Sequence, residues 1–244
     1  MKAMIFAAGL GSRLKPFTDS HPKALAVVNG KTLLERNILY LQKFGIKEVI
    51  VNVHHFADQI IDEIEKHNGW GSTITISDER EEVLETGGGL KKAAWYFEGN
   101  KAFVVMNVDI LTDLDLMEMI RSHEQEKPLA TLAVTQRKSS RYFLFDTYDA
   151  LCGWRNVQTE EEKPADLIDT QEDYDLLKEK AFSGIHIISP DIFSLMKQEG
   201  KFSMVDVYLD LMKKNKINSF DHSGGVLIDV GKPESLLKAA TLFG

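Results

Sequence analysis

The sequence predicts an α/β fold in which helices cover both faces of a mostly parallel sheet. Strand and helix patterns alternate through the first 110 residues. The expected strands are apolar runs at residues 2–7, 49–53, 73–77 and 102–108, and apolar residues recur at helical spacing at 33–44, 60–64 and 90–97. Strands that are apolar on both faces and alternate with crossover helices are typical of a Rossmann-like three-layer αβα sandwich.

The ends of these elements are also marked in the sequence. Thr32 and Glu35 match a capping box, in which two side chains satisfy backbone N–H groups at a helix start. Gly45 is expected to end that helix. The Gly87-Gly88-Gly89 triplet is expected to open onto the helix at residues 90–97.

The second half of the chain is less regular and predicts a small inserted β-region. Strands are expected at 129–134, 142–145, 151–154, 182–188 and 226–230, and helices at 205–212 and 234–243. Residues 159–180 are acidic and poorly patterned, which predicts a loop. No internal repeat or linker interrupts the pattern, so we expect one domain over residues 1–244.

Composition excludes several classes of protein. The chain has 244 residues, with 29 Lys and Arg against 37 Asp and Glu, and a net charge of −8. An acidic surface is a poor match for nucleic acid. The apolar run at residues 3–10 is far shorter than the roughly 20 residues that span a membrane. The single cysteine, Cys152, excludes an internal disulfide and fits a reducing, cytoplasmic compartment.

Two nucleotide-binding motifs are incomplete in this chain. The dinucleotide fingerprint that begins at Gly9 has Leu14 where its third glycine should be. A phosphate loop ending at Lys31 would need a glycine where Leu25 stands. His54 and His55 are adjacent, so they cannot form a metal pair one helical turn apart. These observations disfavour a nicotinamide enzyme and a P-loop NTPase.

The segment that follows the first strand is suited to a polyphosphate. It reads AAGLGSRLKPFT from residue 7, and Pro22-Lys23 follows. Gly9 and Gly11 let the backbone approach a ligand and present N–H groups to its oxygens. Arg13 and Lys23 add two cations at the carboxyl edge of the sheet, where ligands of such folds bind.

These residues resemble the sugar-1-phosphate nucleotidyltransferases, whose signature is G-x-G-x-R-L-x-P-x-T followed by P-K. Further segments are similar in order and spacing, namely 84–89, 107–109, 182–184, the literal Glu-Lys-Pro at 162–164, and 228–234. The resemblance is greatest to short members specific for N-acetylmuramate 1-phosphate, followed by those resembling mannose-1-phosphate guanylyltransferases. It implies a nucleotide-binding half at 1–110 and a sugar-phosphate-binding half at 111–244.

The resemblance also implies the reaction: a sugar 1-phosphate attacks the α-phosphorus of a nucleoside triphosphate and releases pyrophosphate. Arg13 and Lys23 are the implied catalytic residues, and Asp109 and Asp229 the implied ligands of Mg²⁺. The implied nucleotide-binding residues are Ala8, Gly9, Gly11, Arg13, Lys23, Thr86, Gly87 and Gly88. The implied sugar-phosphate contacts are Asn107, Ser183 and Gly184.

The sequence departs from the family pattern at Val108, where most relatives have glycine before the first metal aspartate. Lys163 of the Glu-Lys-Pro is equally compatible with a phosphate ligand and with a solvated charge run. UTP with N-acetylmuramate 1-phosphate is the first substrate expectation, which would place the enzyme in cell-wall metabolism, and GTP with mannose 1-phosphate or another sugar phosphate is the alternative. A glycosyltransferase using Asp113-Leu114-Asp115 and a non-catalytic sugar-nucleotide sensor are alternative classes. The oligomeric state is left open.

Overall fold

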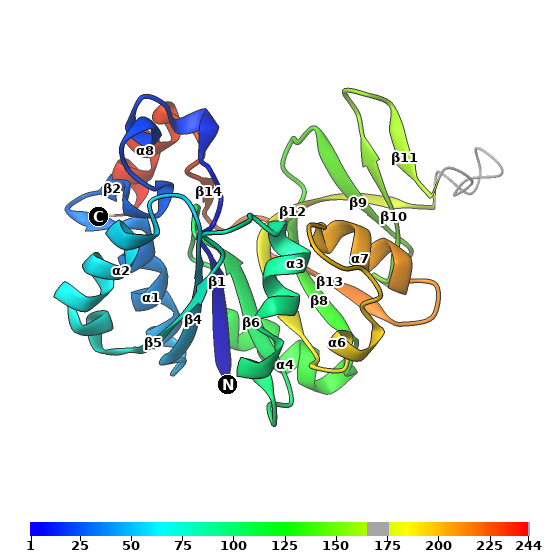
Figure 1. Ribbon diagram of the computed structural model, residues 1–244. Coiled ribbons are helices and arrows are strands. Elements are labelled where there is room, and N and C mark those ends of the chain that lie inside the picture. The colour runs from blue at the N-terminus through cyan, green and yellow to red at the C-terminus, as the bar shows by residue number, and fades with distance from the viewer. Residues whose placement is uncertain (165–175, 244) are drawn as a thin grey trace.

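The computed structural model describes residues 1–164 and 176–243, and its centre is a twisted sheet (Figure 1). The strand order is β13 (Ile217–Asp221), β8 (Ala130–Thr135), β12 (Lys178–Ile188), β6 (Phe103–Asn107), β1 (Lys2–Phe6), β4 (Glu48–Val53) and β5 (Thr73–Asp78). β6, β1, β4 and β5 are parallel, whereas β12 runs antiparallel to both β6 and β8. The predicted α/β class with a mostly parallel sheet is confirmed.

Helices cover both faces of this sheet. They are α1 (Leu33–Lys43), α2 (Ala57–Lys66), α3 (Glu85–Lys92), α4 (Leu116–Glu126), α6 (Ile192–Leu195), α7 (Met204–Leu211) and α8 (Pro233–Leu242). In β1, Ala3 and Ile5 pack in the core formed with α1, α2 and α4, while Met4 and Phe6 pack in the core formed with α3, α6 and α7. Successive side chains of a strand point to opposite faces, so burial on both faces explains the continuous apolar runs.

An extension of this sheet and two small two-stranded sheets complete the fold. The amino-terminal part of β12 pairs with β9 (Arg141–Phe145), which is followed by β10 (Leu151–Asn156) and β11 (Glu161–Lys163), all antiparallel. This is the predicted inserted β-region, and it rises above α7 in Figure 1. β2 (Val27–Val28) pairs with β3 (Lys31–Thr32), and β7 (Ile110–Thr112) pairs with β14 (Leu227–Asp229).

Single-turn 3₁₀ helices lie in the connections. They are η1 (Ser12–Leu14), η2 (Phe17–Asp19), η3 (Lys23–Leu25), η4 (Asn68–Gly71) and η5 (Ala94–Phe97). The first three lie between β1 and β2, after the glycines at positions 9 and 11. No described helix is long and apolar enough to cross a membrane.

Two element predictions need correction. The glycine triplet does not precede its helix but lies inside α3, which begins at Glu85, and the predicted 90–97 segment is split between α3 and η5. The predicted loop at 159–180 contains β11 and the first residues of β12 as strands, because pairing with β9 and β10 outweighs its polar composition. Residues 165–175 of that segment lie outside the described part of the chain. β13 is not predicted from its mixed sequence, INSFD.

Candidate active site

The glycine-containing segment after β1 is fixed by side chains from neighbouring elements. Asn52 Oδ1, at the end of β4, accepts hydrogen bonds from the backbone N–H groups of Ala7 (2.7 Å) and Ala8 (3.3 Å). Gly11 has a left-handed φ of 63°, and a Cβ there would lie 2.8 Å from Thr18 Cγ2. Thr18 Oγ1 donates to the carbonyl of Gly11 at 3.0 Å. The segment therefore has one shape, and only glycine fits position 11.

A cavity of about 510 Å³ opens beside this segment, at the carboxyl ends of β1 and β6. Its lining residues are Phe6, Ala8, Gly9, Leu10, Gly11, Ser12, Lys23, Asn52, Val83, Glu85, Thr86, Asn107, Val108, Asp109, Lys201 and Ser203. Seven of the sequence-predicted site residues are therefore brought together here: Ala8, Gly9, Gly11, Lys23, Thr86, Asn107 and Asp109. Such a position is where parallel α/β sheets bind ligands.

Two ion pairs lie at this edge of the sheet. Lys23 Nζ is 2.5 Å from Asp109 Oδ2, and both side chains are largely buried, with exposed fractions of 15% and 10%. Arg13 Nη2 is 3.7 Å from Asp229 Oδ2, and both of these side chains are about half exposed. The two predicted cations thus each contact one of the two predicted metal ligands.

Asp109 and Asp229 are neighbours through a short antiparallel sheet. Asp229 ends β14 and pairs with Ile110 of β7, and Val230 N donates to the carbonyl of Asp109 at 2.8 Å. Asp229 does not end a strand of the central sheet, because β14 pairs only with β7 in a separate two-stranded sheet. Burial raises the pKa of the Asp229 carboxyl, and the charge of Asp109 raises it further. The cations Arg13, Lys23 and Arg137 act in the opposite direction on that pKa.

This pair of carboxylates fits a hard divalent cation. Within residues 1–164 and 176–243 no group of three or more His, Cys, Asp or Glu side chains forms a metal cluster. Mg²⁺ needs no such cluster, because it is held by one or two carboxylates together with substrate phosphates and water. The mutual repulsion that raises the pKa of Asp229 is the kind of interaction that a bound divalent cation relieves.

Val108 occupies the position before Asp109 without distortion. Its side chain is buried, its N–H donates to the carbonyl of Phe6, and its carbonyl accepts from Asn37 Nδ2 at 2.7 Å. Its φ does not lie in the left-handed region. The backbone before Asp109 therefore has an ordinary conformation that a β-branched residue adopts.

The first two glycines of the triplet pack against Gly200 and Phe202, in the segment before α7. Gly87 N and Gly88 N donate to the carbonyl of Phe202, and a Cβ on either glycine would overlap Phe202 or the carbonyl of Gly200. Thr86 Oγ1 accepts from Met204 N at 2.9 Å. Gly87 and Gly88 are absent from the cavity lining, so their contact with a nucleotide stays a prediction, whereas Glu85 and Thr86 face the cavity.

A buried pair that the motifs did not indicate connects two parts of the site. Asn52 Nδ2 donates to Glu79 Oε1 at 2.8 Å, and Glu79 Oε2 accepts from Leu84 N at 3.2 Å. Gly89 makes room for this pair, since a Cβ there would lie 2.7 Å from Glu79 Oε1. Burial raises the pKa of Glu79. A polar Asn52 inside the otherwise apolar run of β4 is the sequence feature that could have identified it.

The predicted sugar-side residues lie where β12 crosses the end of β6. Gly184 has a φ of 76°, and a Cβ there would lie 2.8 Å from Ile110 Cγ1 and 2.9 Å from Asn107 Nδ2. Ser183 Oγ shares a hydrogen bond of 2.8 Å with His222 Nε2. Ser183 and Gly184 therefore adjoin Asn107, although neither lines the cavity described above.

Lys163 is surrounded by acids. Its Nζ is 3.3 Å from Asp206 Oδ1 and 3.6 Å from Glu161 Oε1, and it lies over the Trp154 ring. With Asp206 it lines a separate hollow of about 350 Å³. Its role as a phosphate ligand stays a prediction.

The literal D-x-D has structural partners in this chain. Asp115 caps α4 by accepting from Met117 N (2.9 Å) and Glu118 N (3.2 Å). Asp113 Oδ1 accepts from Val226 N at 2.7 Å. Both aspartate side chains therefore accept hydrogen bonds from backbone N–H groups, which disfavours the glycosyltransferase alternative.

Comparison with known proteins identifies the family to which this chain belongs. Residues 2–243 match the nucleotidyl transferase family, so the chain belongs to that family and is a nucleotidyltransferase, as the sequence predicted. It is 28% identical to N-acetylmuramate alpha-1-phosphate uridylyltransferase of Neisseria meningitidis, covering 100% of this chain and 99% of that protein. It is 33% identical to D-glycero-alpha-D-manno-heptose 1-phosphate guanylyltransferase of Campylobacter jejuni, covering 96% of each. The crystal structure of HddC from Yersinia pseudotuberculosis complexed with GMP-PN has a TM-score of 0.77 and 26% identity, covering 100% of this chain and 99% of that one.

Proposed function

We propose that this protein transfers a nucleoside monophosphate from a nucleoside triphosphate to a sugar 1-phosphate, releasing pyrophosphate. The observation that carries the proposal is the Lys23–Asp109 ion pair in the lining of a cavity bounded by the signature segment, together with the Arg13–Asp229 pair. Relatives of this size act, by their names, on sugar 1-phosphates.

In the proposed reaction an oxygen of the sugar phosphate forms a bond to the α-phosphorus, and the bond from that phosphorus to the β-phosphate oxygen breaks. The nucleophile is already an anion, so no base is required. Positioning and charge stabilisation supply most of the acceleration in such transfers. Asp109 and Asp229 would hold Mg²⁺, which neutralises phosphate charge when bound.

The chain's own groups divide the remaining work. The N–H groups near Gly9 and Gly11 bind phosphate oxygens, and Arg13 stabilises the charge that develops on the departing pyrophosphate. Lys23 releases Asp109 and then bridges the nucleotide and sugar phosphates. Loss of one preorganised donor of this kind reduces the rate by about 10²–10³-fold.

UTP with N-acetylmuramate 1-phosphate is the proposed substrate pair, and GTP with a mannose or heptose phosphate is the second candidate. Relatives of both kinds support the proposal to similar degrees, at 28% and 33% identity. The GMP-PN complex of a neighbour at 26% identity favours keeping the guanine nucleotide in the test.

The test is Mg²⁺-dependent pyrophosphate release with UTP, GTP, CTP, dTTP and ATP, each paired with N-acetylmuramate, N-acetylglucosamine, glucose, mannose and heptose 1-phosphates. Release with one pair, lost in Asp109→Asn and retained in the matched surface change Asp115→Asn, is expected. Tight nucleotide binding without release for any pair would contradict the proposal and favour a sensor. Formation of a nucleoside diphosphate from a nucleotide sugar would indicate a glycosyltransferase.

A further inference from the structure

Arg137 is an exposed cation that follows β8 on the sugar side of the site. Its Nη2 donates to the carbonyl of Phe182 at 2.7 Å. In the described part of the chain it forms no ion pair with a carboxylate. A guanidinium has five N–H donors, so one neutral carbonyl leaves most of them for another acceptor.

The carbonyl that Arg137 binds lies beside the paired carboxylates. The ladder between β12 and β8 shifts register between Phe182 and His186, which forms a bulge. Inside the bulge, Gly184 packs on Asn107 and Ile110, and Ile110 pairs with Asp229. Bulges redirect side chains near active sites. The carbonyl that Arg137 binds therefore lies two residues before Gly184, which packs on Asn107 and Ile110.

The other cations near this edge are already engaged with carboxylates. Lys23 contacts Asp109, Arg13 contacts Asp229, and Lys201 contacts Glu85. Lys163 lies between two acids, Asp206 and Glu161, so its surroundings carry net negative charge. Lys23 must first release Asp109 before it can bind a phosphate, whereas Arg137 has no carboxylate partner to release, so it can supply a second cation to a dianionic acceptor phosphate.

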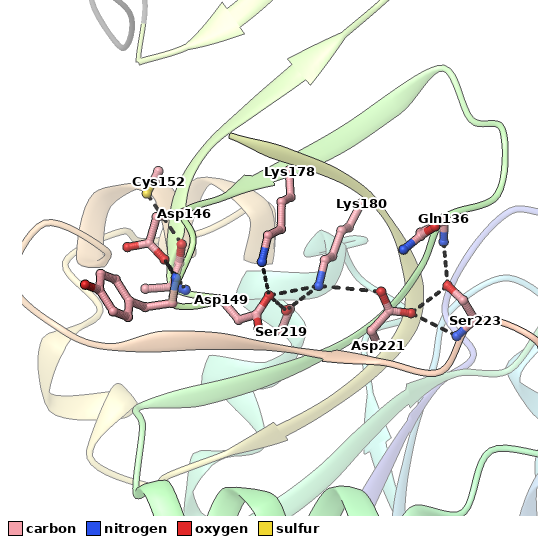
Figure 2. Close-up of polar contacts among 11 residues, drawn as sticks. Gln136, Asp146, Asp149, Cys152, Lys178, Lys180, Ser219, Asp221 and Ser223 are labelled. Carbon is pink, nitrogen blue, oxygen red and sulfur yellow. Dashed lines mark hydrogen bonds and ion pairs between the residues drawn. The ribbon is translucent and has the colours of Figure 1, made fainter. Parts of the chain in front are cut away.

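A polar network fixes the strand ends from which Arg137 projects (Figure 2). Gln136 N donates to Ser223 Oγ at 2.9 Å, and Ser223 N and Oγ bond to Asp221 Oδ1. Asp221 Oδ2 is 3.5 Å from the Nζ of Lys180, which is buried.

Lys180 extends this network to the neighbouring elements. Its Nζ also donates to Asp149 Oδ1 at 3.0 Å and to Ser219 Oγ at 3.1 Å, so β12, β13 and the connection between β9 and β10 are joined (Figure 2). Buried charges of this kind persist only when they are paired and hydrogen-bonded. The backbone at residue 136 is therefore held in place, and Arg137 starts from a fixed position.

We propose that Arg137 binds the phosphate group of the sugar 1-phosphate acceptor, with Phe182 O orienting its guanidinium. This inference rests on the proposed function. Arginine binds phosphate through two parallel N–H donors, which gives a defined direction as well as charge. The bound phosphate would then lie between Arg137 and the carboxylate pair, within reach of the nucleotide.

The test compares Arg137→Gln and Arg137→Lys with the wild type, and uses Arg141→Gln as the matched control. Arg141 is an exposed arginine four residues along, at the start of β9, whose side chain has no described partner. Initial rates are measured with the sugar 1-phosphate varied and then with the nucleoside triphosphate varied. We expect Arg137→Gln to lower kcat/KM for the sugar phosphate by about 10–100-fold, the usual effect of a charged hydrogen bond.

The KM for the nucleotide should stay within about twofold of the wild-type value in both Arg137 variants. Arg137→Lys should recover part of the loss in kcat/KM for the sugar phosphate, because lysine keeps the charge but lacks the two parallel N–H donors. Arg141→Gln should match the wild type. Equal losses for both substrates would overturn the proposal and assign Arg137 a role in maintaining the β12 bulge. The proposal would also be overturned if Lys163→Ala raised the KM for the sugar phosphate and Arg137→Gln left that KM unchanged.

Calorimetric titration of the sugar 1-phosphates into wild type and Arg137→Gln separates this inference from the proposed function. Weaker binding in the variant supports Arg137 whether or not turnover is detected. Equal binding overturns it even when the wild type is active. Absence of pyrophosphate release by the wild type would contradict the proposed function alone.

Discussion

Asn52 joins the signature segment to Glu79 through the two ends of one amide. Its Oδ1 accepts from Ala7 N at 2.7 Å, while its Nδ2 donates to Glu79 Oε1 at 2.8 Å. Glu79 continues the chain of bonds to Leu84 N, directly before α3. Two walls of the cavity of about 510 Å³ are thus held together by one buried amide–carboxyl contact.

The first prediction concerns an exchange of these two groups. Asn52→Asp places two carboxyls together in a buried site, so we expect a loss of roughly 1–3 kcal/mol in the free energy of unfolding. Glu79→Gln added to Asn52→Asp restores a donor between the side chains and an acceptor for Leu84 N. The double variant should recover much of the loss, measured by urea denaturation as a double-mutant cycle.

Activity should follow the same order, because the exchanged pair again fixes both cavity walls. The KM for the nucleotide should rise in Asn52→Asp and return toward the wild-type value in the double variant. Additive losses in the double variant would show that the two side chains are not coupled, contrary to the bonding described above.

The second prediction tests the close approach of β12 to β6. Gly184 and Gly99 both have a φ of 76°, but a Cβ at Gly184 would meet Ile110 and Asn107 whereas one at Gly99 meets nothing within 4 Å. Gly99→Ala should cost only the left-handed conformation, about 1–2 kcal/mol. Gly184→Ala should cost about 1–3 kcal/mol more by chemical denaturation, through overpacking.

Gly184→Ala should also lower activity, because it displaces Asn107 two residues before Asp109. Gly99→Ala should retain full activity, since Gly99 lies in the connection before β6, away from the site. Equal stability and activity in the two variants would show that the β12 bulge can relax without disturbing the site.

The sequence was sufficient for the parts of the fold set by local patterns. Apolar runs identify the four parallel strands, and the side chain of Thr32 caps α1 as predicted by accepting from Glu35 N at 3.1 Å. The signature segment identifies Lys23 as a candidate, and the resemblance at residues 107–109 identifies Asp109, before any geometry is known.

What the sequence could not show depends on pairing between distant segments. β13 is a mixed sequence that becomes a strand because β8 offers it an unpaired edge. β14 leaves the main sheet to pair with β7, and this brings Asp229 to Asp109. The contact of the glycine triplet with Phe202 likewise joins segments more than 100 residues apart, which no local motif encodes.

The third prediction separates capping from catalysis in the D-x-D segment. Asp115→Ala removes the acceptor for Met117 N and Glu118 N at the start of α4, so it should lower the free energy of unfolding by about 1 kcal/mol. Its kcat and its dependence on Mg²⁺ concentration should match the wild type. Asp115→Asn, which keeps the cap, is the control. A raised Mg²⁺ requirement in Asp115→Ala would assign metal binding to this segment instead of Asp109 and Asp229.

The fourth prediction concerns acid stability and a buried histidine. His186 lies in β12, and its Nδ1 shares a hydrogen bond of 2.7 Å with the hydroxyl of Tyr208. Burial lowers the pKa of His186 from 6.5 to about 3. Below pH 6.5 the unfolded chain therefore binds a proton that the folded chain does not, so stability that is present above this pH is lost as the pH falls toward 3.

In this pH range the difference in proton binding at His186 should lower the free energy of unfolding by about 1.4 kcal/mol for each unit by which the pH falls. Urea denaturation of wild type, His186→Gln and the exposed control His55→Gln between about pH 7 and pH 5 measures that slope. His186→Gln can still form a hydrogen bond with Tyr208. Its free energy of unfolding should decrease less steeply than that of the wild type as the pH falls, and the two slopes should differ by about the contribution of one bound proton. His55→Gln should keep the wild-type slope, because its side chain is exposed. A His186→Gln slope equal to that of the wild type would mean that His186 takes up its proton in the folded protein as readily as in the unfolded chain.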